Sequence, residues 1–532
     1  MASFVAWGNR YQLNPDGISY IDLARAVATN GPHAAINGYW SPGYPLLLLP
    51  IVAAFRGDVG LLIPAVHVVN LVLSVLAVAL FAAVLRTLAS RPPAATPLAR
   101  HATTLAIAVG AVTAIETIGF GLLTPDVAVM LVVVATVACV FALEQDGARN
   151  APFVALGVVL GIGYWIKGIL LPLDLLLLSL LLTFPPRIRG ARARLIVTGI
   201  VFTIVAAPLF IAVSHHLGRI SPGDVGKLNY AWAVDGITPF SGWQGDSVTR
   251  FGAPTHGPRT LWPVPRVIEF ATPVPGTYPL WYDPSYWYAG VKPAFDLAGQ
   301  WSAIRQGALD LGVVLLQQWA TIVAVLLVWG ATRRRPGDTA RSRMPLVLGL
   351  WSAGATILYA AVHVESRYLA GFILVAIAAG WASLVQREER PRWNVRRAAS
   401  AALGVLAISL AINVEENSGA PSPSYRPPYV AEGDSLHALG ARSGSPVAAV
   451  GDAFEQYATF TAATPVLAQV LDSTGFWGAA PSVRAAIAQR LAQIGVRAIV
   501  ANNVAAEFGG EGWHIIARPD SANLGVLPLS PP

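Results

Sequence analysis

The stretch AAVHVESRYLAGF, residues 360–372, places three ionisable side chains in a short turn between two apolar runs. His363, Glu365 and Arg367 occupy that turn. Charged groups in an apolar setting are costly unless they are paired or serve a function. The turn therefore raises two questions: whether the chain crosses a membrane on either side of it, and what the charges do there.

The composition of the 532-residue chain is typical of a polytopic membrane protein. Hydrophobic residues make up 55% and charged residues 12%, and the mean hydropathy is +0.56, whereas soluble proteins contain about 25% charged residues. The isoelectric point of 9.6 does not indicate nucleic-acid binding, because only three lysines are present and most arginines cluster between apolar runs. The single cysteine, Cys139, excludes a disulfide framework and a cysteine metal site.

Ten apolar runs predict ten membrane-spanning helices. Most are long enough to cross a hydrocarbon core of about 30 Å. The fourth and fifth are short and only Lys167 separates them, so we expect them to meet at a tight turn. The predicted spans are residues 60–86, 102–122, 125–143, 152–166, 168–184, 195–214, 308–331, 345–362, 368–385 and 398–413.

Arginines alternate from loop to loop and predict the orientation. The positive-inside rule places the arginine-rich loops in the cytoplasm. The outer face then carries the N-terminus, the 114–125 turn, Lys167, the long loop 215–307, the turn at 363–368 and the tail from 414 onward. The segment MASFVAWGNRYQL (1–13) is too short and polar to span a bilayer and is no signal peptide, so we expect it to be the stub of a missing first helix. The eighteen cytoplasmic arginines are Arg86, Arg91, Arg100, Arg149, Arg187, Arg189, Arg192, Arg194, Arg333, Arg334, Arg335, Arg341, Arg343, Arg387, Arg390, Arg392, Arg396 and Arg397.

The first outer loop contains NPDGISYIDLARAV, residues 14–27, and NGYWSPGYPLLLLP, residues 37–50. The Asn-Pro-Asp-Gly turn signal precedes a short predicted amphipathic helix with Asp16 at its mouth. Asp16 is either a helix cap or a functional acid. The Trp-Ser-Pro-Gly-Tyr-Pro stretch is consistent with an interfacial segment. The apolar residues that mark the helix are Ile18, Ile21, Leu23 and Ala24.

Further charges are predicted on the same face. Asp126 follows Thr124-Pro125 and is a plausible helix cap, whereas Glu116 has apolar neighbours on both sides and needs a partner. Lys167 either snorkels to the interface or is held beside these acids. In the 363–368 turn, the alternative to a functional role is a structural ion pair between Glu365 and Arg367.

Acids and cations together at a membrane–water boundary suggest group transfer from a phosphate. An acid serves as general base for an incoming hydroxyl, and the cations hold a phosphate and stabilise its charge as it leaves. Arginine suits this role because its planar fork matches phosphate oxygens. A phosphate at the membrane surface implies a lipid carrier.

These motifs resemble the GT-C superfamily of integral membrane glycosyltransferases, in particular the branch of lipid A aminoarabinose transferases and protein O-mannosyltransferase-like enzymes. The resemblance covers about residues 9–385. It rests on the first-loop Asp followed by SYIDLA and YWSPGYP, on the Thr-Pro-Asp turn, on YWIKG and on HVESRYL. It implies a mainly α fold, a polytopic transmembrane helix bundle of GT-C type. It also implies a polyprenyl-phosphate-linked sugar donor, a hydroxyl acceptor and inversion at the anomeric carbon.

By this resemblance Asp16 is the catalytic base, and Glu116 or Asp126 is the second acid that positions acceptor or donor. Relatives often have an Asp-Glu pair in the first loop, whereas here Gly17 follows Asp16. No cofactor is expected, and a divalent metal is left open. The residues expected at the donor phosphate are Lys167, Arg367, Glu365, His363 and Tyr20.

The long outer loop, 215–307, is rich in aromatic residues and prolines. Its tryptophans form either an interfacial belt or stacking faces for sugar rings, and we expect short helices that cap the donor cavity. The adjacent His215 and His216 have no apparent acid partner at ligand spacing, so no metal site is assigned there. The tryptophans are Trp232, Trp243, Trp262, Trp281, Trp287 and Trp301.

The composition changes at the linker SGAPSPSYRPP, residues 418–428. Short strands around PVAAVGD, TPVLAQVL, VRAIVAN, GWHIIAR and LGVLPL, with a helix at 482–495 ending at Gly495, predict a small C-terminal extracytoplasmic α/β domain, residues 414–532. Gly451-Asp452 is only a weak sign of a nucleotide site. We expect an accessory role in acceptor binding or stability.

The function predicted from the sequence is sugar transfer from a polyprenyl-phosphate donor to a lipid, glycan or protein hydroxyl, at the periplasmic face of the bacterial inner membrane. The alternatives are a transporter or lipid flippase, which favours charges at the bilayer midplane, and an inactive scaffold. The expected partners are the donor, the acceptor and the bilayer, and not nucleic acid.

Overall fold

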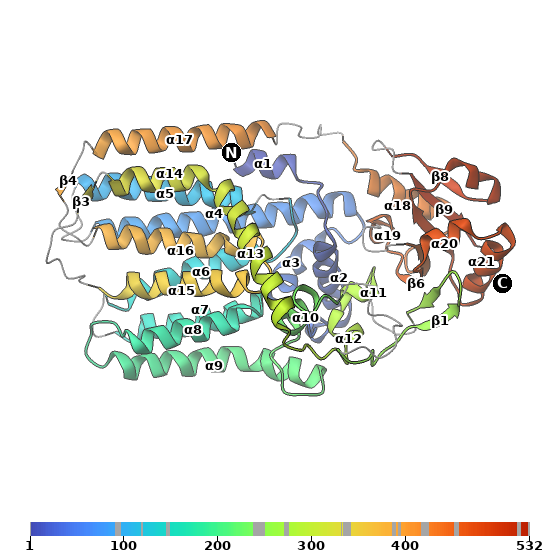
Figure 1. Cartoon of the computed structure of the whole chain (residues 1–532), viewed down its shortest axis with the longest axis horizontal. Helices are drawn as coiled ribbons and strands as arrows, with labels where there is room; N and C mark the ends of the chain where they lie inside the picture. Colours follow the sequence, from blue (N-terminus) through green and yellow to red (C-terminus); the bar gives the residue numbers. More distant parts are fainter. Residues whose placement is uncertain are drawn as a thin grey trace.

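The computed structural model shows a helix bundle at one end of the long axis and an α/β unit at the other (Figure 1). The helices α10, α11 and α12 lie between these two parts (Figure 1). The structure describes residues 2–90, 97–118, 121–144, 149–237, 251–270, 276–330, 332–333, 342–385, 390–391, 395–416, 425–451, 457–518 and 523–529.

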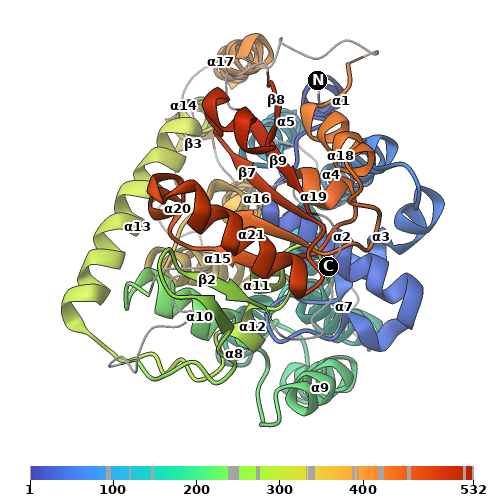
Figure 2. The same cartoon turned by 90° about the vertical axis from the view of Figure 1, so that its right-hand side faces the viewer.

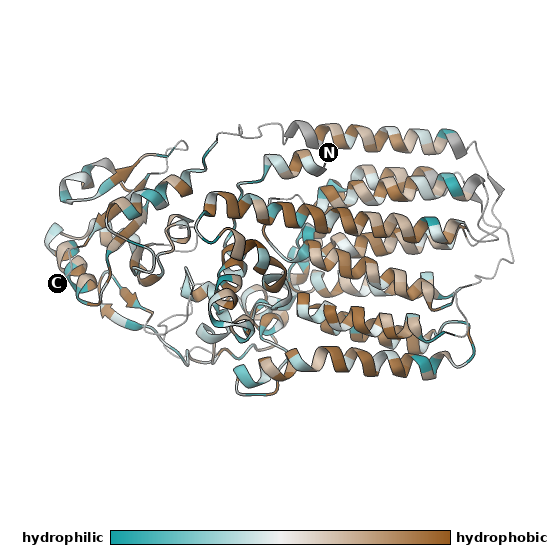
Figure 3. Cartoon of the chain, turned by 180° about the vertical axis from the view of Figure 1, so that it is seen from behind, coloured by the Kyte–Doolittle hydropathy of each residue, from teal (hydrophilic) through white to brown (hydrophobic). Residues whose placement is uncertain are grey.

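The bundle consists of long apolar helices at the predicted positions, so the predicted helical fold class is confirmed. Four of the described helices are long and apolar enough to cross a membrane, or five if one bent pair counts as a span, and shorter apolar helices accompany them. Figure 3 shows that these helices consist mostly of hydrophobic residues. The helices are α4 (Val59–Ala89), α5 (Pro97–Ile118), α6 (Asp126–Ala142), α7 (Ala151–Ile166), α8 (Leu170–Thr183), α9 (Ala191–His216), α15 (Met344–Ala360), α16 (Ser366–Val385) and α17 (Val395–Glu416).

One predicted span, 308–331, is not a straight helix. It is divided between α13 (Leu297–Gln317) and α14 (Trp319–Gly330), which are bent by 66° relative to each other. The first part crosses the turn between α15 and α16. There the Gln300 side chain donates to the Ala361 carbonyl at 2.7 Å, and a Cβ on Gly307 would lie 2.2 Å from the Ala360 oxygen. This close packing over the turn is incompatible with one straight membrane helix.

One end of the bundle carries arginines that the sequence assigns to the cytoplasm. The paired strands β3 (Thr332–Arg333) and β4 (Arg390–Pro391) contain two of the predicted cytoplasmic arginines. They lie at the end of the bundle away from α10–α12 (Figure 1). Six of the eighteen arginines lie outside the described residues: Arg91, Arg334, Arg335, Arg341, Arg387 and Arg392.

The predicted first outer loop forms short helices packed on the end of the bundle that faces the α/β unit (Figure 1). Its predicted amphipathic helix is α2 (Pro15–Asn30), and the four apolar residues that marked it are buried. A second helix, α3 (Gly43–Ala54), begins within the predicted interfacial stretch and packs against α2. The short helices of this region and of the long loop are α1 (Ala2–Gly8), η1 (Pro32–Ala35), α10 (Val225–Ala233), α11 (Pro279–Tyr282) and α12 (Pro284–Trp287).

The C-terminal part has the predicted strands and helix. Three parallel strands form its centre, and α21 ends before Gly495, which has a positive φ of 93°. Asp452 lies outside the described residues. The elements are α18 (Pro428–Ala438), β5 (Val447–Val450), α19 (Tyr457–Thr461), β6 (Val466–Val470), α20 (Ser473–Gly478), α21 (Pro481–Gln493), β7 (Ala498–Asn502), η3 (Ala506–Glu511), β8 (His514–Ile516) and β9 (Leu524–Pro528).

The sheet of this part is larger than the tail alone. It has seven described strands in the order β1-β2-β6-β5-β7-β9-β8. Figure 2 views this end of the molecule, with β2, β7, β9 and β8 labelled. The hairpin β1 (Arg259–Trp262) and β2 (Val267–Glu269) belongs to the long outer loop, and β2 pairs antiparallel with β6. A domain boundary at residue 414 therefore leaves two strands of this sheet, β1 and β2, outside the C-terminal domain.

Candidate active site

The loop before α6 and the start of α2 are held together by Asn14 and Gly17. The Asn14 side chain accepts a hydrogen bond from the Leu123 amide at 2.8 Å. A Cβ on Gly17 would lie 2.6 Å from the Leu123 Cβ, closer than two carbons can approach. Glycine at the position after Asp16 therefore allows a contact between α2 and the segment preceding Asp126.

Asp16 is not the N-cap residue of α2, because Asn14 occupies that position. Its Oδ1 accepts a hydrogen bond from Trp281 Nε1 at 3.0 Å, and its Oδ2 lies 3.6 Å from Arg367 Nη2. Burial raises the pKa of Asp16 above its ordinary value, while Arg367 and the Trp281 hydrogen bond oppose this rise. The carboxylate is thus held in place by a neutral donor and a nearby cation.

Asp126 is the first residue of α6 and is buried. Its Oδ1 accepts a hydrogen bond from Lys167 Nζ at 2.5 Å, and Thr124 donates to Oδ2 at 2.8 Å. Lys167 follows directly after α7 and also lies 4.2 Å from the centre of the Tyr368 ring. Lys167 is therefore held beside an acid, which is the second of the two interpretations of Lys167 offered from the sequence.

Arg367 lies between the acids of three segments. Its Nε donates to Glu365 Oε2 at 2.6 Å and lies 3.7 Å from Asp126 Oδ2, and its side chain is 11% exposed. The Glu365–Arg367 ion pair is thus present together with the approach to Asp16 and Asp126. A guanidinium held this way presents a fixed fork at the junction of α2, α6 and α16.

Glu365 is the centre of a small network on the turn. His363 Nε2 lies 3.1 Å from its Oε1, and the Tyr368 hydroxyl donates to the same oxygen at 3.1 Å. Although burial acts to raise the pKa of Glu365, the contacts with His363 and Arg367 lower it to about 2. Glu365 therefore stays ionised and orients Arg367.

Tyr20 lies one helical turn after Asp16 on the same face of α2. Its ring packs edge-on against Trp40 at 5.0 Å and Tyr44 at 5.3 Å. Burial, and then the charge of Asp16, raise the pKa of Tyr20 well above its ordinary value. The residue is placed to line the space beside Asp16 as a neutral phenol.

Glu116 is the predicted site residue that the structure does not bring to this cluster. Its carboxylate faces α17 and the break after α13, where it accepts hydrogen bonds from Ser409 and Gln318. Of the two candidates for the second acid, the geometry favours Asp126.

Aromatic side chains from both outer loops gather beside Asp16. The rings of Trp232 and Trp281 are 5.5 Å apart at 30°, and Tyr39 lies 5.5 Å from Trp232 and 5.9 Å from Trp281. The sequence predicted a tryptophan-rich loop but not which tryptophan contacts Asp16, since Trp281 is 265 residues away. Trp243 lies outside the described residues.

One histidine of the adjacent pair, His216, does have an acid partner. His216 Nε2 lies 3.2 Å from Asp283 Oδ2, a residue from the far side of the long loop. In the described part of the chain, no three His, Cys, Asp or Glu side chains are grouped to hold a metal ion.

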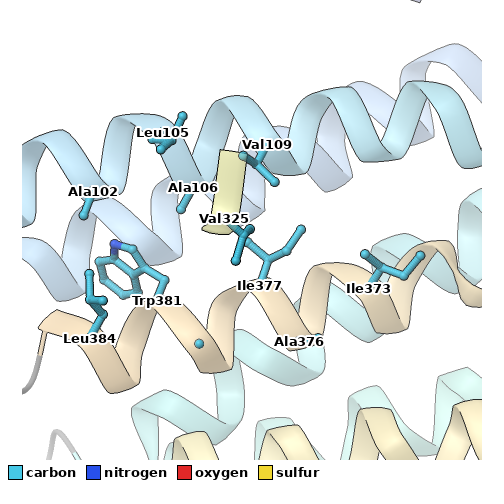
Figure 4. A pocket seen from close by; sticks show the side chains of 11 residues that line it. Ala102, Leu105, Ala106, Val109, Val325, Ile373, Ala376, Ile377, Trp381 and Leu384 are labelled. Carbon is cyan, nitrogen blue, oxygen red and sulfur yellow. The ribbon is translucent and has the colours of Figure 1, made fainter. Parts of the chain in front are cut away.

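A hollow of about 320 Å³ lies within the bundle, between α5 and α16 and beside α14 (Figure 4). Its lining includes Leu105, Val325, Ile377 and Trp381, and is almost wholly apolar. None of the predicted site residues borders it.

Comparison with known proteins was made by sequence and by structure. No family model and no curated protein matches the sequence. The structure resembles ArnT from Cupriavidus metallidurans in the apo state, with 14% identity, a TM-score of 0.57, and coverage of 100% of this chain and 97% of ArnT. The chain has the GT-C fold.

A second GT-C structure, ArnT bound to undecaprenyl phosphate, matches at 13% identity with the same TM-score of 0.57 and the same coverage of 100% and 97%. The apo oligosaccharyltransferase of Archaeoglobus fulgidus matches at 12% identity and a TM-score of 0.49, over 94% of this chain and 68% of that one. The GT-C fold confirms the architecture implied by the motifs.

Proposed function

We propose that this GT-C protein is a membrane glycosyltransferase that moves a sugar from a polyprenyl-phosphate carrier to a hydroxyl acceptor. The observation that carries the proposal is the convergence of Asp16, Asp126, Lys167 and Arg367, four side chains from separate segments, at one end of the bundle. We place this end at the extracytoplasmic face of a bacterial inner membrane, because the arginine-rich loops are assigned to the cytoplasm.

In this proposal Lys167 and Arg367 hold the donor phosphate. Both lie at helix ends that we assign to the outer face, at the level of a lipid phosphate, and both contact acids. Asp126 and Glu365 fix the two cations by short contacts of 2.5 Å and 2.6 Å. The similarity in fold to a protein crystallised with undecaprenyl phosphate supports a polyprenyl carrier.

Asp16 acts as the general base. It removes the proton of the acceptor hydroxyl while the hydroxyl oxygen bonds to the anomeric carbon of the donor sugar. The bond between that carbon and the phosphate oxygen breaks, and the polyprenyl phosphate leaves with the electron pair. The cations stabilise the charge that the leaving phosphate gains, and attack from the opposite face inverts the anomeric centre.

Tyr39, Trp232 and Trp281 supply aromatic faces next to the base. Such faces pack well against the apolar surface of a sugar ring, while polar groups fix its orientation. Trp281 joins these two roles because its ring belongs to the aromatic group and its N–H holds Asp16.

The alternative function, a transporter or flippase, would have its substrate site near the bilayer midplane. Here the charged cluster lies at the first residues of α6 and α16 and directly after α7. Charges at helix ends fit a reaction at the membrane surface better than a translocation path.

The test uses a strain from which the gene is deleted and lipid-linked sugars are surveyed by mass spectrometry. We expect one polyprenyl-phosphate sugar to accumulate, to disappear with the wild-type gene and to remain with Asp16→Asn expressed at the same level. Loss of a general base costs about 10²–10⁴-fold in rate. Full complementation by Asp16→Asn would exclude Asp16 as the base, and no change in any lipid-linked sugar would exclude the transferase itself.

A further inference from the structure

A second polar cluster lies outside the candidate active site, around Glu116. Gln318 Nε2 donates to Glu116 Oε2 at 3.1 Å, and Ser409 Oγ donates to Oε1 at 2.5 Å. The three residues come from α5, from the break between α13 and α14, and from α17. Their surroundings are apolar, because the same helices pack through a buried cluster that includes Val112, Ala320 and Leu406.

Among the described residues, the Glu116 carboxylate has no cationic partner. Within the described part of the chain, both hydrogen bonds to the Glu116 carboxylate come from neutral groups, and no lysine, arginine or histidine lies within ion-pair distance of it. A carboxylate among apolar helices needs a compensating positive charge.

A buried acceptor without a partner lies beside the carboxylate. Gln318 is 3% exposed, and its Oε1 has no hydrogen-bond partner among the described residues. The amide nitrogen of the same side chain donates to Glu116, so the unpartnered oxygen belongs to a group that contacts the carboxylate. Buried polar atoms without partners are rare in native proteins and call for an explanation such as an ion or water.

More oxygen atoms lie one helical turn away. Thr113 Oγ1 and Thr321 Oγ1 are 3.1 Å apart, and both residues are buried. Thr113 is three residues before Glu116, and Thr321 is three residues after Gln318. The region is thus rich in side-chain oxygens and carries a single formal charge.

We propose that Glu116, Gln318 and Ser409 bind a monovalent metal cation of the sodium type through their oxygen atoms. Hard cations prefer carboxylate, amide and hydroxyl oxygens. One carboxylate balances one positive charge, whereas a divalent ion would leave a net charge among apolar helices. Membrane proteins use helix interruptions to build such sites, and the 66° bend at Gln318 is an interruption of this kind.

The bound cation stabilises the junction of α13 with α14. Because α13 contacts the Ala360–Ala361 end of the 363–368 turn through Gln300 and Gly307, the cation site also helps to hold this cover in place. That consequence rests on the proposed function of the turn, whereas cation binding itself does not.

The experiment measures the thermal unfolding midpoint of the full chain in detergent as NaCl replaces N-methyl-D-glucamine chloride at constant ionic strength. A ligand that binds the folded state raises the midpoint with its concentration. We expect wild type to be stabilised by Na⁺, Glu116→Gln to lose the response, and the control Asp310→Asn, which removes an acid from α13 away from the cluster, to keep it. Ser409→Ala keeps the charge and removes one ligand. The Na⁺ concentration that gives half of the rise in the unfolding midpoint should therefore increase about tenfold, which corresponds to a loss of about 1.4 kcal/mol in binding free energy.

An equal Na⁺ response in wild type and Glu116→Gln would overturn the proposal, as would no response in wild type. A stabilisation that follows pH rather than Na⁺ and disappears in Glu116→Gln would show a bound proton instead and would also overturn it. If Glu116→Gln does not fold, Ser409→Ala decides: an unchanged Na⁺ response there contradicts the site. These outcomes are independent of the Asp16→Asn result, so failure of the cation site is distinguishable from failure of the transferase.

Discussion

Burial raises the pKa of Asp16, whereas its two neighbours Arg367 and Trp281 act to lower it. A general base works only when ionised, so transfer should fall as the pH drops through the raised pKa of this group. Trp281→Phe removes the N–H that stabilises the carboxylate, and we expect the acidic limb of the pH–rate profile to move to higher pH. Trp262→Phe, in the same loop, is the matched control. An unshifted limb in Trp281→Phe would contradict the assignment of the limb to Asp16.

Glu365 contributes to stability in a defined pH window. Its pKa falls from 4.5 to about 2 on folding, so its contribution is complete above pH 4.5 and is lost as the pH falls toward 2. Glu365→Gln should therefore lower the unfolding temperature near neutral pH, and the difference from wild type should shrink below pH 4.5. A difference that stays constant from pH 7 to pH 3 would show that the ionised carboxylate is not what stabilises the turn.

The sequence identified most charged residues of the site but not their neutral partners. Asp16, Lys167 and Arg367 could be assigned to one face from apolar periodicity and the arginine pattern alone. The contact of Trp281 with Asp16 depends on how the long loop folds back, which no local pattern encodes. Glu116 was placed at the correct end of its helix, but hydropathy does not show which neighbouring helix a side chain faces.

At the scale of elements, the contact between α2 and the loop before α6 depends on Gly17. Gly17→Ala would place a Cβ 2.6 Å from the Leu123 Cβ, forcing the loop and Asp126 away from Asp16. Overpacking of this kind costs about 1–3 kcal/mol, and we expect reduced transfer as well as a lower unfolding temperature. Gly226→Ala in α10, where nothing lies within 4 Å of the added Cβ, should be neutral or slightly stabilising. Equal effects of the two changes would contradict the close-contact argument.

The apolar runs predicted the helices well because a helix that crosses a membrane must consist mainly of apolar residues. The exception is the 308–331 run, since the polar pair Gln317 and Gln318 does not by itself reveal a 66° bend. That bend depends on α13 packing over the turn after α15, which is a tertiary contact.

At the scale of the whole molecule, the outer loops and the C-terminal part fold around a common core. One buried cluster joins Ile21 of α2, Phe270 and Trp287 of the long loop, and Val447 and Val500 of the sheet. The β1–β2 hairpin adds strands to the same sheet. The C-terminal part therefore positions the loop that carries Trp281, and we expect the two to unfold together.

A proline within β2 tests this coupling. Ile268 pairs with Thr260 on one side and Gln469 on the other, and proline disrupts pairing inside a sheet. Ile268→Pro should increase hydrogen exchange in β1, in β6 and in residues 277–282. Proline at His514, in the edge strand β8, should have only local effects. Unchanged exchange at 277–282 in Ile268→Pro would show that the loop is held independently of the sheet.

The sequence could not predict that β1 and β2 belong to the sheet of the C-terminal part, and the reason is physical. The strands β1 and β2 have four and three residues, too few to show an alternating pattern. The strand β6, with which β2 pairs, lies about 200 residues further along the chain. The strands of the tail, in contrast, are apolar and bounded by turn residues, and they were located from sequence.

The central claim is that Lys167 and Arg367 hold a polyprenyl phosphate beside Asp16. The most direct test is the affinity of the purified full chain for undecaprenyl phosphate, measured for wild type, Arg367→Gln and Asp16→Asn. Hydrogen bonds to charged groups contribute about 1.5–3 kcal/mol, so Arg367→Gln should weaken binding at least about tenfold. Asp16→Asn, which removes a negative charge near the phosphate, should bind as well as wild type or better. Binding by Arg367→Gln that equals wild type would contradict the account.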